Sequence, residues 1–183
     1  MNARAVIISI LLLTGCGYNR IQTLDEEVSA FSSQIEVQLQ RRSDLIPNLV
    51  NTVKGIATQE ETVFTAVADA RARLGGAIEG GSFGEMAAAN EGLTSALGRL
   101  LVIAEAYPEL RSSQNFRDLQ AQLEGTENRL STARQDYNNA VRAYNAYIRR
   151  FPQVLTAKMT GAGPREYFEV ADAAREAPTV NFN

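Results

Sequence analysis

Apolar residues recur at alternating steps of three and four over most of the chain. The longest such stripe starts at Ile21 and, with one interruption at residues 35–39, reaches Leu74. This spacing places the apolar side chains on one face of an α-helix, and that face must pack against other helices. Only residues 179–182 resemble a strand, and they are too few to build a sheet. The pattern predicts an all-α fold, an elongated up-and-down antiparallel helical bundle.

Glycines and prolines divide the stripe pattern into separate helices. Gly75 and Gly76 are expected to end the first helix, and a glycine-rich loop to follow as far as Gly84. The later helices are expected at residues 83–107, 113–151, 154–159 and 165–176. At a rise of 1.5 Å per residue, the first three helices would be about 80, 37 and 57 Å long. The first helix is therefore expected to extend beyond its partners.

Pro47 lies inside the first predicted helix. A proline there removes one backbone hydrogen bond and kinks or breaks the helix. Ser43 and Asp44 are suitable N-cap residues, so a break at this point would give four helices of more equal length. Residues 39–49 contain no glycine or turn cluster, and we therefore expect a kink near Pro47.

The N-terminus has the pattern of a bacterial lipoprotein signal peptide. Arg4 supplies a positive charge, and residues 5–13 form an apolar run interrupted only by Ser9. Leu13, Thr14, Gly15 and Cys16 follow as a lipobox, with cleavage expected before Cys16 and lipid on its sulfur. The run is too short for a spanning helix, which needs about 20 apolar residues. Cys16 is the only cysteine, so it has no disulfide partner within the chain.

Cleavage would remove residues 1–15 and leave residues 16–183 as a single domain. Residues 17–36 would then form a membrane-proximal helical stalk. The acylated cysteine would hold the protein in the membrane on the extracytoplasmic side. Gly17 replaces the aspartate that typically retains lipoproteins at the inner membrane, which favours the periplasmic face of the outer membrane.

Composition excludes several classes of function. The formal net charge is −3 and no basic patch occurs, which argues against nucleic-acid binding. The chain has no histidine, and so lacks the commonest general base and metal ligand. Di-metal sites in helical bundles use Glu-x-x-His repeats, which are absent from this sequence. We therefore expect no catalysis, no metal and no cofactor.

Polar residues interrupt the apolar faces of the first and third predicted helices. Arg42 and Glu60 lie on the first stripe, where an unpaired charge would be costly. Polar residues also recur at helical spacing on the third predicted helix, beside its apolar face. The expected polar layer comprises Arg42, Asn48, Glu60, Arg134, Asn138 and Asn145. Such a layer either fixes the register of the helices, as in coiled coils, or forms a binding site.

Several motifs resemble those of the LemA family, in the same order along nearly all of the mature chain. The signature stretch is residues 41–50, followed by 53–55 and Glu60. The later motifs are 106–110, 123–127, 133–138, 144–145, 151–152, 167–168 and 178–182. The resemblance implies a membrane-attached all-helical bundle outside the cytoplasm, and implies no reaction. This chain departs from the family in two ways: a lipobox replaces the usual transmembrane segment, and Gln59 occupies a position where members often carry histidine.

Two functions agree with these observations. The first is a non-catalytic, lipid-anchored interaction or scaffold protein of the cell envelope that docks a protein partner at the membrane. The alternative is a binding module for an envelope lipid or a cell-wall-derived ligand. A pocket of a few hundred Å³ lined by Arg42, Glu60 or Asn138 would favour the alternative.

Overall fold

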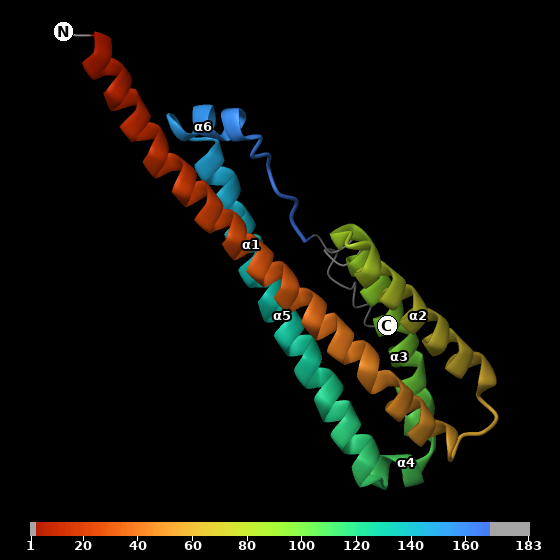
Figure 1. The fold of residues 1–183 in the computed structure, drawn as a ribbon. Coiled ribbons are helices and arrows are strands. Elements are labelled where there is room, and N and C mark those ends of the chain that lie inside the picture. Colours follow the sequence, from red (N-terminus) through yellow and green to blue (C-terminus); the bar gives the residue numbers. More distant parts are fainter. Residues whose placement is uncertain (1–2, 169–183) are drawn as a thin grey trace, which may run out of the picture. The chain divides into compact units, whose positions relative to one another are not determined.

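The structure, a computed structural model, describes the backbone of residues 3–168 and the side chains of residues 17–168. This part of the chain contains six α-helices and no strand, which confirms the predicted all-α fold (Figure 1). The helices are α1 (Ala3–Lys54), α2 (Glu61–Gly80), α3 (Phe83–Ala106), α4 (Pro108–Ser112), α5 (Gln114–Ile148) and α6 (Gln153–Thr160). None of these helices is both long enough and apolar enough to cross a membrane.

The chain divides into two compact units, and both α1 and α5 run from one unit into the other. Unit 1 comprises residues 1–35 and 132–167, and unit 2 comprises residues 36–131 and 168–183. In unit 2, α2 turns back beside the end of α1, and α3 and the first part of α5 complete an antiparallel four-helix arrangement (Figure 1). In unit 1, the first part of α1 lies beside the end of α5, and α6 follows.

Helix α1 continues through Pro47 without a break, so the alternative of a reversal at Ser43 and Asp44 is wrong. Proline has no N–H to donate to the carbonyl oxygen of Ser43, one helical turn earlier. The Nε of Arg71, on α2, donates a 2.9 Å hydrogen bond to this oxygen instead. A side chain from a neighbouring helix therefore satisfies the carbonyl that Pro47 leaves without a donor.

The first helix ends much earlier than the apolar stripe predicts. Helix α1 stops at Lys54, and α2 begins at Glu61 after a tight turn. The N–H of Ala57 donates to the Val53 carbonyl oxygen at 2.9 Å, and Ala57 is fully buried. Buried residues thus continue at a helix-like spacing across the turn, from Val53 through Ala57 to Phe64, which explains why the periodicity does not reveal it.

The glycine-rich segment is mostly helical, which corrects the predicted loop at residues 75–84. Gly75 and Gly76 lie inside α2, where Leu74 and Ala77 are buried on either side. The helix ends instead at Gly81, whose φ of 70° is left-handed and suits glycine. The hydroxyl of Ser82 then caps α3 by accepting a 3.5 Å hydrogen bond from the Glu85 N–H. Burial of the neighbouring residues outweighs the cost of a mid-helix glycine, about 1 kcal/mol.

The later helices lie close to their predicted positions. Pro108 ends α3 and also occupies the first turn of the short helix α4, where its missing N–H costs nothing. Leu110 of α4 is fully buried. The expected helix at 165–176 is not seen at residues 165–168, which are not helical. Residues 169–176 and the strand-like stretch 179–182 lie outside the described residues.

Each unit has its own apolar core. Residues 17–36, expected to form a stalk, contribute Ile21, Leu24, Val28 and Ile35 to the core of unit 1, so this part of α1 is packed rather than bare. In unit 2 the fully buried side chains come from every helix: Leu39, Ile46, Leu49, Val53, Leu74, Met86, Leu93, Leu100, Leu110 and Leu130. Burial of each such side chain contributes about 1.5–3 kcal/mol.

Candidate functional site

The segment after α6, residues 161–167, crosses unit 1 as an extended strap. It begins at Gly161, whose φ of 73° is left-handed, and the N–H of Ala162 donates to the Ala157 carbonyl oxygen at 2.9 Å. An extended segment without a neighbouring strand needs other partners for its backbone groups. Side chains of α5 supply these partners.

Asn145 binds the strap as an adjacent strand would. Its Nδ2 donates to the Arg165 carbonyl oxygen at 2.8 Å, and its Oδ1 accepts from the Arg165 N–H at 2.8 Å. Two turns earlier on α5, the Tyr137 hydroxyl donates to the Glu166 carbonyl oxygen at 2.8 Å. Burial raises the pKa of Tyr137. Asn145 is itself buried, so its side-chain amide would lose stability if it had no hydrogen-bond partner, and the strap provides one.

An ion pair ties the strap to α1. The Arg165 Nε and Nη2 donate to the two carboxylate oxygens of Asp25, both at 2.9 Å. This parallel fork is the strongest geometry for an arginine and a carboxylate, although both side chains remain accessible to water and the pair adds little stability. The hydrogen bonds that Arg165 donates to Asp25 raise the pKa of Arg165.

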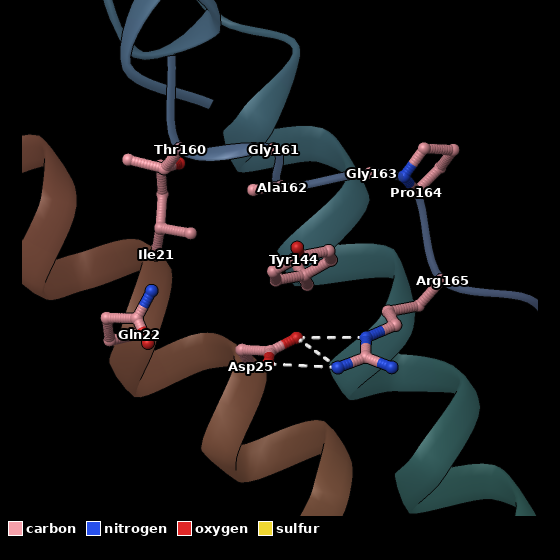
Figure 2. A pocket seen from close by; sticks show the side chains of 10 residues that line it. All are labelled: Ile21, Gln22, Asp25, Tyr144, Thr160, Gly161, Ala162, Gly163, Pro164 and Arg165. Carbon is pink, nitrogen blue, oxygen red and sulfur yellow. Dashed lines mark hydrogen bonds and ion pairs between the residues drawn. The ribbon is translucent and has the colours of Figure 1, made fainter. Parts of the chain in front are cut away.

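A pocket of about 400 Å³ lies between the strap and the two long helices of unit 1. Figure 2 shows the Tyr144 ring between the start of the strap and the Asp25–Arg165 pair. Ile21 and Gln22 of α1 line the remaining side. Burial and then the Asp25 charge raise the pKa of Tyr144, so its phenol is neutral and can act as a hydrogen-bond donor near pH 7. None of the residues that line this pocket forms a pair of nucleophile and base.

A second polar cluster, which we call the Arg42 cluster, lies inside unit 2 and comprises Arg42, Asn90, Thr94 and Glu127. Arg42 Nη1 donates to Asn90 Oδ1 at 2.8 Å and also pairs with Glu127, while its Nη2 donates to Thr94 Oγ1 at 3.1 Å. Burial lowers the pKa of Arg42, and the carboxylate of Glu127 opposes that effect. The Arg42 cluster connects α1 to α3 and α5, and Arg42 lines neither the cavity in unit 1 nor the one between α2 and α3.

The structure places the six residues of the expected polar layer in different surroundings. In unit 2, Arg42 is buried, Asn48 is exposed on α1 and Glu60 lies partly exposed just before α2. In unit 1, Asn145 is buried against the strap, and Arg134 and Asn138 are partly buried on α5.

The partners of Arg42 are Asn90, Thr94 and Glu127, none of which belongs to the polar layer expected from the sequence. Asn90 gave a usable signal, because it interrupts the apolar stripe of the second predicted helix. The sequence gave no such signal for the pair of Asp25 and Arg165 that links α1 to the strap. The pocket in unit 1 also lacks the lining residues that we expected of a binding site, namely Arg42, Glu60 and Asn138.

A smaller cavity of about 320 Å³ lies between α2 and α3 in unit 2. Small residues such as Ala70, Ala89 and Gly92 line it, together with Asp69 and Arg99. Among residues 17–168, no three carboxylates or thiols come together in a way that would hold a metal ion.

Comparison with known proteins identifies the family of this chain. The family model named LemA family matches residues 31–182. The chain belongs to the LemA family. The Arg42 cluster, most of the polar contacts of the strap and most residues that line the two cavities lie within the part that matches LemA proteins. The apolar run and Cys16 precede it.

Curated relatives of this LemA chain include proteins named for the magnetosome. Magnetosome proteins MamQ 2 and MamQ 1 of Paramagnetospirillum magneticum are each 31% identical to it over 175 residues. Magnetosome protein MamQ of Magnetospirillum gryphiswaldense is 30% identical over 174 residues. The alignments cover 82–83% of this chain and 64% of each relative, so the chain spans less than two thirds of their length.

Proposed function

We propose that this LemA protein is a non-catalytic, lipid-anchored interaction or scaffold protein of the bacterial cell envelope. The observation that carries the proposal is the lipobox that ends at Cys16, directly after an apolar run too short to span a bilayer. The magnetosome relatives agree with a place at a membrane. The acylated cysteine faces the extracytoplasmic side, with the periplasmic face of the outer membrane favoured.

The use of the polar side chains supports a role without chemistry. Arg42, the most deeply buried charge among residues 17–168, contacts three partners on α3 and α5. Asp25 and Arg165, the charged groups of the pocket, neutralise each other. These groups have their partners within the units, and the outer helical faces are left for a partner protein.

Acylation of Cys16 is tested by substitution together with fractionation. Cys16→Ala should abolish lipid attachment and leave an unprocessed chain, as read by intact-mass spectrometry of the membrane fraction. Gly17→Ala is the matched control, because an added Cβ would lie 3.5 Å from Thr156 Oγ1, an ordinary contact, and processing should persist. A mature, membrane-bound Cys16→Ala protein at wild-type level would reject the anchor.

The choice of membrane is tested at the next residue. Gly17→Asp should restore the inner-membrane retention signal and move the protein from the outer to the inner membrane in a sucrose gradient of a two-membrane cell. An unsubstituted protein found at the inner membrane would refute the favoured location and leave acylation intact.

The interaction role is tested with a photo-crosslinking amino acid in living cells. We would place it at Ala88 in the α2–α3 cavity and at Val102, a strongly exposed apolar position of α3. A discrete adduct with another protein is expected from at least one position. Absence of any adduct from these and other exposed helical positions would contradict the interaction role.

The pocket in unit 1 favours a second candidate, a binding module for an envelope lipid or a cell-wall fragment. Its volume of about 400 Å³ falls within the range of small-molecule sites, and Tyr144 and Arg165 offer donors to a polar ligand. Gln22 is exposed at its edge, so Gln22→Trp should block the pocket without disturbing the core. Saturation-transfer NMR with soluble wall fragments should then lose its signal in the variant. Equal signals from both proteins, or none from either, would reject this candidate.

A further inference from the structure

Large apolar side chains are exposed to solvent in the turn between α5 and α6 and on one face of α6. We call residues 149–160 the elbow. Phe151 is 81% exposed, Leu155 is 54% exposed and Met159 is 83% exposed. Leu155 and Met159 are four residues apart and so share one face of α6, while Thr156 and Ala157 are buried on the other side. The elbow therefore presents an apolar ridge that unit 1 does not cover.

The charges nearest to this ridge along the chain are basic. Residues 137–164 contain Arg142, Arg149, Arg150 and Lys158 and no Asp or Glu, and residues 17–24 contain Arg20 and no acid. Arg149, Arg150 and Lys158 are exposed and form no ion pair within the described part of the chain. An exposed apolar face with basic flanks is typical of segments that lie in the interface of an anionic bilayer.

The elbow also lies next to the lipid attachment point. A Cβ built on Gly17 would be 3.5 Å from Thr156 Oγ1 and 3.8 Å from Gln153 Cγ, so α6 touches the residue directly after Cys16. Figure 1 shows α6 beside the N-terminal part of α1, within unit 1. Whatever surface holds the acyl chains of Cys16 is therefore within reach of the elbow.

We propose that the elbow rests on the anionic lipid headgroups of the leaflet that holds acylated Cys16, with Phe151, Leu155 and Met159 dipping below the headgroups. This inference rests on the lipid anchor of the proposed function and adds a second contact with the membrane. Two linked contacts hold a protein more firmly than either alone and also restrict its orientation. Long basic side chains reach headgroup phosphates from the edge of an apolar surface, as Arg149, Arg150 and Lys158 would here.

A lipid surface fits the elbow better than a protein partner does. A stable protein interface buries roughly 800 Å² on each side, more than three side chains supply. A second copy of the chain would bring two elbows of the same positive charge together, which is unfavourable. A bilayer rich in phosphatidylglycerol has the opposite charge and no minimum contact area.

The test uses the mature lipoprotein in vesicles of phosphatidylethanolamine and phosphatidylglycerol. Because acylation consumes the sole cysteine thiol, Met159→Cys introduces one free thiol for an environment-sensitive dye. The matched control is Gln34→Cys, an exposed position of unit 1 about 25 Å further along α1 than Gly17 at the rise of a helix. The dye at 159 should be blue-shifted, and lipid-borne spin labels should quench it at least threefold more than the dye at 34.

A charge-reversed variant adds an independent measurement. Arg150→Glu with Lys158→Glu should at least halve the quenching at position 159, since both substitutions lie at exposed positions outside the core. Intact mass records acylation in the same samples. An acylated protein whose dye at 159 reports water would overturn the membrane contact and leave the anchor standing. A blue shift without lipid quenching would show that protein covers the elbow, which also overturns it. An unacylated chain in the membrane would reject the anchor and, with it, this inference.

Discussion

Replacing Glu127 by alanine leaves the Arg42 guanidinium inside unit 2 with neutral partners only. The Arg42 side chain is 6% exposed, so water cannot replace the lost carboxylate, and Asn90 and Thr94 are its remaining hydrogen-bond partners. Breaking a buried ion pair by removing one member costs about 3–5 kcal/mol, because the other charge stays buried. The Glu127 side chain is 40% exposed, and solvent screening weakens the pair. We therefore expect a loss of about 3 kcal/mol, the lower end of that range.

Arg42 is far more buried than Glu127, so other substitutions at the two positions should differ in their cost to stability. Glu127→Gln keeps an acceptor for Arg42 and should cost about half as much as the alanine substitution. Arg42→Met combined with Glu127→Ala removes the stranded charge, so the double variant should be more stable than Glu127→Ala alone. Glu124→Ala, at an exposed site three residues earlier on α5, is the matched control and should change stability by less than about 0.5 kcal/mol.

Urea unfolding of each variant, followed by circular dichroism at pH 7, measures these differences. A loss of about 3 kcal/mol lowers the unfolding midpoint by about 1–3 M urea for a typical dependence on denaturant. Two results would refute the reasoning: Glu127→Ala as stable as Glu124→Ala, or a double variant no more stable than Glu127→Ala. Either would mean that the guanidinium reaches water or another acceptor once Glu127 is gone.

Three further predictions concern the strap and the glycines. Asn145→Ala removes both bonds to the backbone of Arg165; it should cost about 2 kcal/mol and abolish hydrogen-exchange protection of the Arg165 amide, and a still-protected amide would contradict the role of the strap. Because the pKa of Tyr144 is raised in the folded protein, its neutral phenol contributes stability below the unfolded pKa near 10, and this contribution is lost as pH rises through the folded pKa. The melting temperature, measured at pH 8, 10 and 11, should therefore fall less steeply with pH in Tyr144→Phe than in the wild type. Identical slopes would disprove the coupling. Gly81→Ala should destabilise by about 1 kcal/mol because of its left-handed φ, whereas Gly76→Ala inside α2 should stabilise by about 0.5–1 kcal/mol; equal signs in thermal melting would count against the assigned cap.

The existence of the helices followed directly from the apolar spacing, but some of their ends did not. The stripe from Val53 to Leu74 keeps its spacing across the turn at residues 55–60, because Ala57 is buried in the turn and Phe64 soon after it. A local apolar pattern indicates which residues are buried, but it does not reveal a turn that preserves the spacing of the buried residues. Gly76 predicted a helix end where none occurs, because burial of the neighbouring Leu74 and Ala77 outweighs the low helix propensity of glycine.

The polar sites show the same division. Arg42 was identified from the sequence as a charge on an apolar face that needs partners, and Asn145 as a polar residue beside the apolar face of the third predicted helix. The identity of the partners was beyond the sequence. Asn90 and Glu127 are 48 and 85 residues from Arg42, and no local rule selects among several acidic and amide residues at such separations.

What the sequence determined by itself is what acts over a few residues: the helical periodicity, the apolar run before Cys16, and the absence of histidine, which removes the commonest catalytic base. What only the tertiary structure decided is which distant groups meet. Asp25 and Arg165 are 140 residues apart, and their ion pair, the strap and the pocket exist because α1, α5 and α6 pack in one particular register. Apolar spacing specifies the buried face of each helix, whereas the register between helices depends on the fit of all their side chains together.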